Sequence, residues 1–137
     1  MTSFKTLSTE CRNLSGPNRV LDGKIFRTLH GVDGDVWSDM VGDDGVWHRR
    51  DHEDHAAWEG PPEYTGSIDV ALSARAVGMR LSALRELLKP DARAHDWQPC
   101  VCIIETTTWV HNGQGETLAL ALMDAILLSH AHLHGER

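Results

Sequence analysis

Four residues in one short stretch have the types and spacing of metal ligands. His48, His52 and His55 are four and three positions apart, with Asp51 next to His52, and in a helix the three histidines would share one face. Three such ligands could hold Zn²⁺ and leave one position open for a water molecule, as a metal-dependent hydrolase requires. The stretch lacks H-E-x-x-H or an equivalent signature and has no strong helical stripe. We therefore expect no metal cofactor, with His48, His52 and His55 as the alternative metal ligands.

A second group combines aromatic and basic side chains in the same part of the chain. Trp37 and Trp47 flank the turn signal Asp-Asp-Gly at 43–45, and Arg49 and Arg50 follow directly. Indole rings can stack on a nucleobase, and guanidinium groups can bind a phosphate. One alternative function is therefore a sponge that sequesters a nucleotide signal. The competing interpretation, which we favour, is that the tryptophans anchor a segment otherwise poor in core residues.

The negative charge of the chain is concentrated between residues 33 and 63. The 137 residues carry a net charge of −7, and positions 33–63 hold ten acidic residues against two arginines. A solvated, loop-rich surface is the plain interpretation. Acidic residues would repel a phosphate backbone, so we expect no direct nucleic-acid binding. The sharper hypothesis is an acidic surface that binds a basic partner protein, and the residues assigned to it are Asp39, Asp43, Asp44, Asp51, Glu53 and Asp54.

No nucleophile has a recognisable setting in this sequence. There is no G-x-S-x-G elbow, P-loop or Rossmann glycine pattern. The cysteines form no C-x-x-C pair, and they are typical of buried, reduced thiols in a cytoplasmic protein. The histidines near position 130 are interpreted as polar residues at a frayed helix end. The chain is therefore expected not to be an enzyme. The cysteines are Cys11, Cys100 and Cys102, and the histidines near position 130 are His130, His132 and His134.

Hydrophobic spacing predicts the elements that must position these residues. Apolar residues recur at helical spacing over 4–14, 20–29 and 68–88, and the helix expected at 116–132 is apolar almost all round. No apolar run approaches the roughly 18 residues that cross a membrane, and residues 1–15 lack the apolar centre of a secretory signal. The sequence therefore predicts several helices, with neither a membrane span nor a secretory signal, and the cytoplasm as the location.

One continuous apolar run, at 99–110, predicts a strand covered on both faces and followed by a turn at 111–115. A further hairpin of short strands is expected within 36–50. These elements predict a single domain over residues 1–137, of the α/β class, with a small sheet sandwiched between helices in an α-β-α sandwich. The acidic, loop-rich segment occupies 31–63. In the core, Leu118, Leu122 and Ile126 are expected to pack against Val101 and Ile103.

Three stretches occur together in a familiar order: GPNRVLDGKI at 16–25, YTGSIDVAL at 64–72 and ETLALAL at 116–122. They are similar to the patterns GP-x-R-x-LD-x-x-I, YT-x-S-L/I-D-x-A-L and A-T-P-A-L-A-L of small phage and prophage proteins of unknown function, related to the phage ABA (alpha-beta-alpha) sandwich domain. The chain departs from that pattern by an added segment at 80–95 and by lacking the proline before ALAL. The resemblance implies a phage-encoded accessory protein and brings no catalytic residues.

The leading hypothesis is therefore a non-enzymatic phage- or prophage-encoded protein of the host cytoplasm. It is expected to inhibit a host defence component by binding that protein through the acidic surface. The alternatives are the nucleotide sponge and the metal-dependent hydrolase that uses the histidine cluster at 48–55. Neither a membrane partner nor a cofactor is expected, and the sequence leaves a homo-oligomer open.

Overall fold

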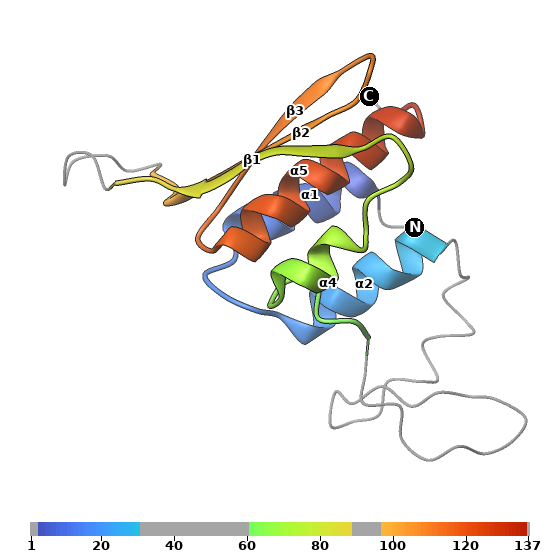
Figure 1. Ribbon diagram of the computed structural model, residues 1–137. Coiled ribbons are helices and arrows are strands. Elements are labelled where there is room, and N and C mark those ends of the chain that lie inside the picture. Colours follow the sequence, from blue (N-terminus) through green and yellow to red (C-terminus); the bar gives the residue numbers. More distant parts are fainter. Residues whose placement is uncertain (1–2, 31–60, 89–96, 137) are drawn as a thin grey trace, which may run out of the picture.

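The computed structural model describes residues 3–30, 61–88 and 97–136. In this structure a three-stranded antiparallel sheet packs against helices (Figure 1). The sheet has the order β1-β2-β3. The α/β class predicted from the sequence is confirmed. The elements are α1 (Phe4–Asn13), α2 (Arg19–His30), α4 (Ile68–Leu72), β1 (Arg80–Glu86), β2 (Cys100–Glu105), β3 (Val110–Gly115) and α5 (Leu118–Leu133).

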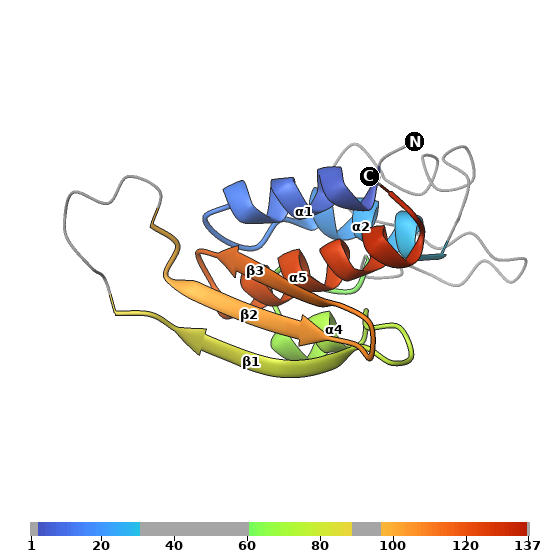
Figure 2. The ribbon, with the colours of Figure 1, turned by 90° about the horizontal axis from the view of Figure 1, so that it is seen from above.

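Helix α5 is the centre of the core. It contacts all three strands and also α1 and α4, and twelve of its sixteen residues are buried. Figure 2 shows α1 beside α5, next to the β3 edge of the sheet. An apolar surface all round a helix is satisfied only when other elements cover most of that surface. The prediction of a buried final helix is confirmed, and so are the predicted helices that became α1 and α2.

The two faces of β2 have different environments. Cys100, Cys102 and Ile104 are buried, whereas Val101 and Ile103 are partly exposed on the opposite face. Alternate residues of a strand point to opposite faces, so the expected packing of the last helix against Val101 and Ile103 is wrong. The described helices lie on one side of the sheet (Figure 1), and none of them covers the face that bears Val101 and Ile103.

The helix predicted over 68–88, with a possible interruption at Gly78, is confirmed at its start and wrong beyond Leu72. Helix α4 ends at Leu72, Gly78 adopts a left-handed φ of 92°, and β1 begins two residues later. Leu81 and Leu84 are three residues apart, which suggested a helical stripe. They both pack against the core because the strand register shifts between Leu81 and Ala83, and one extra residue in a bulge returns the next leucine to the same face.

Residues 111–115, which were predicted to form a turn, belong to strand β3. The turn that connects β2 to β3 lies at 106–109. There the amide of Thr106 donates to the carbonyl of Trp109 at 2.8 Å. Gly113 and Gly115 face α5: a Cβ on Gly113 would lie 2.8 Å from the Cβ of Ala125, and one on Gly115 would lie 2.6 Å from the amide nitrogen of Ala121. These glycines therefore allow the helix to approach the strand backbone.

Candidate functional site

The residues assigned to function from the sequence lie outside the described residues. This holds for the candidate partner-binding, ligand-binding and metal-binding positions alike, so no geometry bears on them. Within the acidic segment, Glu63 is described, and its side chain is exposed. The assigned residues are Asp39, Asp43, Asp44, Asp51, Glu53 and Asp54 of the acidic surface, Trp37, Trp47, Arg49 and Arg50 of the nucleotide site, and His48, His52 and His55 of the metal site.

A buried carboxylate joins the two chain segments that flank residues 31–60. Oδ1 of Asp22, on α2, accepts hydrogen bonds from the amide and the hydroxyl of Thr65, each at 2.8 Å. Oδ2 accepts from Arg19 at 2.8 Å, and Arg19 also donates to the carbonyl of Pro61 at 2.6 Å. The amide of Asn18 donates to the Thr65 hydroxyl at 2.8 Å. The start of α2 and residues 61–65 are thereby held together.

This network joins residues of two motif stretches. Arg19 and Asp22 belong to the stretch at 16–25, and Thr65 belongs to the stretch at 64–72. Burial raises the pKa of Asp22, while the hydrogen bonds from Thr65 and the Arg19 guanidinium oppose that rise. All these donors and acceptors are used within the fold, so their role is to connect elements rather than to carry chemistry.

A second buried carboxylate joins α5 to α1 and β3. Asp124 accepts hydrogen bonds from the hydroxyl of Ser8, from Nε and Nη2 of Arg12 at 3.1 and 3.0 Å, and from the amide of Gln114 at 2.8 Å. Burial raises the pKa of Asp124, and these donors act in the opposite direction. A buried carboxylate with partners on two other elements is a satisfied structural group. In the sequence, Asp124 is the one acidic residue in the apolar run 118–128, and this could have indicated a buried carboxylate.

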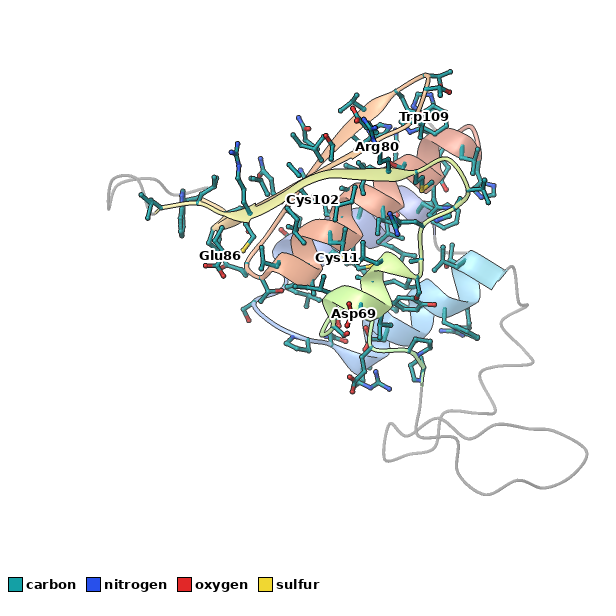
Figure 3. The ribbon with its side chains drawn as sticks, in the orientation of Figure 1. Cys11, Asp69, Arg80, Glu86, Cys102 and Trp109 are labelled. Carbon is teal, nitrogen blue, oxygen red and sulfur yellow. The ribbon has the colours of Figure 1, made fainter. Side chains whose placement is uncertain are left out.

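The three cysteines are free and buried, as the sequence predicted. Burial raises the pKa of Cys102 to about 12, and it raises the pKa values of Cys11 and Cys100 as well. The thiolate is the reactive form of cysteine, so these thiols are poor nucleophiles at neutral pH. Figure 3 shows Cys11 and Cys102 among the packed helices and sheet.

The C-terminal end of α5 is closed, and the frayed end expected from the sequence is wrong. Gly135 has a φ of 71°, its amide donates to the carbonyl of His132 at 3.1 Å, and the amide of Glu136 donates to the carbonyl of Ala131 at 2.8 Å. This pair of bonds is the Schellman motif that ends many helices. The carboxylate of Glu136 then accepts from the amide of Phe4 at 3.0 Å, which caps the first turn of α1.

The histidines of α5 take part in this closure. His130 is buried, and its Nε2 lies 2.7 Å from the carbonyl oxygen of Ala74. Its ring stacks on Phe4 with centroids 5.1 Å apart, and His134 stacks on the same phenyl ring at 5.1 Å. Burial lowers the pKa of His130, and the neighbouring His134 lowers it further. The neutral form of His130 is therefore part of the core.

A separate pair of histidines lies on another side of the same helix end. Nε2 of His111, on β3, and Nδ1 of His132, on α5, are 3.2 Å apart. The indole of Trp109 stacks on His132 with ring centroids 4.3 Å apart and planes 12° apart. Figure 3 shows Trp109 beside the end of α5. In the part of the chain that the structure describes, no three histidine, cysteine or acidic side chains converge as metal ligands.

No family model, no curated protein and no solved structure matches this chain. Among residues 3–30, 61–88 and 97–136, no helix has both the length and the apolar character needed to cross a bilayer.

Proposed function

We propose that the protein is a non-enzymatic binding protein that acts through its acidic segment, residues 33–63, on a basic surface of a partner protein. One observation carries the proposal: the charge of the chain is divided unequally. Positions 33–63 carry ten acidic residues and two arginines, whereas the rest of the chain carries ten acidic and eleven basic residues. Concentrated charge of one sign speeds association with an oppositely charged partner and selects against partners of the same sign.

The buried carboxylates and thiols among the described residues have structural roles, and this supports a binding function rather than an enzymatic one. Asp22 and Asp124 have hydrogen-bond partners within the fold, and the thiols of Cys11, Cys100 and Cys102 are buried with raised pKa values. A general acid, base or nucleophile needs a reactive group within reach of a substrate. The resemblance of the motif stretches supports a phage or prophage origin, with a host defence component in the host cytoplasm as the partner.

A functional assay with matched charge variants tests this proposal. The first variant reverses Asp43, Asp44 and Asp51 to Lys in the acidic segment. The control reverses Asp69, Glu86 and Glu116, three exposed acids outside that segment, so both proteins undergo the same change of net charge. Each protein is produced in host cells that carry a defence system, and phage plating efficiency is measured. We expect the segment variant to lose the protection of phage that the parent and control variant provide.

The same assay separates the two alternative functions. A nucleotide sponge predicts that Trp37→Ala or Arg49→Ala abolishes protection while the three reversals are tolerated, since stacking and phosphate contacts would carry the binding. A metal-dependent hydrolase predicts that His52→Ala abolishes protection and that the chelator-treated protein is inactive. Equal protection by the segment variant and its parent would contradict the acidic-surface proposal.

A further inference from the structure

Two histidines from different elements face each other at the edge of the described fold. His111 lies on β3 and His132 lies in the last turn of α5, and their nearest ring nitrogens, Nε2 and Nδ1, are 3.2 Å apart. The two rings meet edge to face, with planes 69° apart. The side chain of His132 is exposed and that of His111 is partly exposed, so solvent reaches the pair.

The distance between these nitrogens matches the spacing of two ligands on one metal ion. Imidazole nitrogens bind Zn²⁺ at about 2.0–2.1 Å, and in a tetrahedral complex two of them are therefore about 3.3–3.4 Å apart. The observed separation of 3.2 Å differs from that value by little. The separation of the two nitrogens is therefore compatible with two ligands of one ion.

The protonation state of the two histidines also allows both facing nitrogens to bind a metal ion. Without a metal, one ring donates its N–H to the lone pair of the other. Moving that proton to the far nitrogen of its own ring frees both facing lone pairs, with no net loss of a proton.

The surroundings hold the two rings in place and favour a cation. The indole of Trp109 stacks on His132, which restricts the orientation of that ring. His132 lies in the last turn of α5, where the partial negative charge of the helix end stabilises positive charge. Both histidines are carried by regular elements, β3 and α5, that pack against each other along their length.

We propose that His111 and His132 bind a divalent transition-metal ion that prefers imidazole, of the class of Zn²⁺, Ni²⁺ and Cu²⁺. The two histidines supply two ligands, and water molecules fill the remaining positions. This site is separate from the cluster His48, His52 and His55, and it does not depend on the acidic segment.

Calorimetric titration of the full chain, freed of any affinity tag and of metal, tests the site with ZnCl₂ and with NiCl₂. His111→Ala and His132→Ala should each bind one ion fewer per chain than the parent. His134→Ala is the matched control, because this exposed histidine of the same helix end lies outside the pair, and it should bind as the parent does. A second control, the combined His48→Ala, His52→Ala and His55→Ala protein, should keep the ion assigned to His111 and His132.

A spectroscopic measurement keeps the test independent of folding. In the parent, histidine ring resonances of His111 and His132 should shift together as Zn²⁺ is added, with those of His134 unchanged. Unchanged stoichiometry in both His111→Ala and His132→Ala would overturn the proposal. So would a parent chain that binds no metal, or loss of all binding in the triple variant alone.

Discussion

Asp22 and Thr65 are 43 positions apart in the chain, yet the amide and the hydroxyl of Thr65 both donate to the same carboxylate oxygen of Asp22 at 2.8 Å. The acidic segment lies in sequence between these two residues. Loop-closure entropy rises only slowly with loop length, so one well-satisfied pair of hydrogen bonds can hold the ends of a long segment together. The network therefore joins the start of α2 to residues 61–65.

Removing this carboxylate should destabilise the fold. In Asp22→Ala, the buried amide and hydroxyl of Thr65 lose their acceptor, and we expect the free energy of unfolding to fall by about 1–3 kcal/mol. Urea denaturation followed by circular dichroism measures the change. Glu86→Ala, at an exposed position on β1, should change stability by no more than about 0.5 kcal/mol. Equal urea midpoints for the two variants would show that the network contributes nothing.

Truncation of a core residue on α5 should cost more. Leu122 is fully buried against the sheet and neighbouring helices, and Leu122→Ala should lower the free energy of unfolding by about 2–5 kcal/mol. Leu133, which is 52% exposed at the end of the same helix, provides the control. A Leu122→Ala protein as stable as Leu133→Ala would contradict the central position of α5.

Because β3 lies so close to α5, a single Cβ atom added to the strand should destabilise the protein. A Cβ at residue 113 would lie 2.8 Å from the Cβ of Ala125, so Gly113→Ala should force the strand and helix apart and destabilise the protein by more than about 1 kcal/mol. Gly16→Ala is the matched control, because a Cβ there meets no atom within 4 Å. Thermal unfolding compares them, and a Gly113→Ala protein that melts with its Gly16→Ala counterpart would be inconsistent with this packing.

The buried His130 should make stability depend on pH. Burial lowers the pKa of His130, and the buried Nδ1 has no hydrogen-bond partner among the described residues. The unfolded chain, with a histidine pKa near 6.5, therefore binds more protons than the folded chain. Stability is complete above that pH and falls as the pH decreases from about 6.5 towards the lower pKa of the folded protein.

Urea denaturation at pH 7.5 and pH 5.5, for the parent and His130→Phe, measures this contribution. The phenyl ring keeps an aromatic side chain beside Phe4 but cannot take up a proton. We expect the parent to lose more stability than His130→Phe between the two pH values, while His111 and the remaining histidines contribute equally to both proteins. The same loss in both proteins would rule out His130 as the source of the pH dependence.

The elements predicted correctly from the sequence are those with one clear apolar face. Phe4, Leu7 and Cys11 repeat at helical spacing and are buried on α1, and the apolar run after residue 117 forms the buried helix α5. Strand β1 was missed because a bulge puts leucines three residues apart on one face of a strand. Strand β3 was missed because its glycines, which permit contact with α5, are also typical of turns.

The polar networks could be predicted only in part, because they join residues far apart in the chain. Asp22 and Thr65 lie in motif stretches that the sequence singled out, but nothing in their spacing indicated that they meet. Asp124 interrupts an apolar helix, and that interruption alone could have suggested a buried partner such as Arg12. The pairing of His111 with His132 depends on the register of β3 against α5, which the periodicity of neither segment contains.

The proposed role of the acidic segment is tested by the rate at which the protein associates with a basic partner protein. The measurement compares the parent, the variant with Asp43, Asp44 and Asp51 reversed to Lys, and the Asp69, Glu86 and Glu116 control at low and at physiological salt. Exposed charges are screened over about 8 Å at physiological ionic strength. We expect the parent and the control to associate quickly at low salt and more slowly as salt is added, and the segment variant to associate slowly at both. Association of the segment variant as fast as the parent at low salt would contradict the proposed role of the acidic segment.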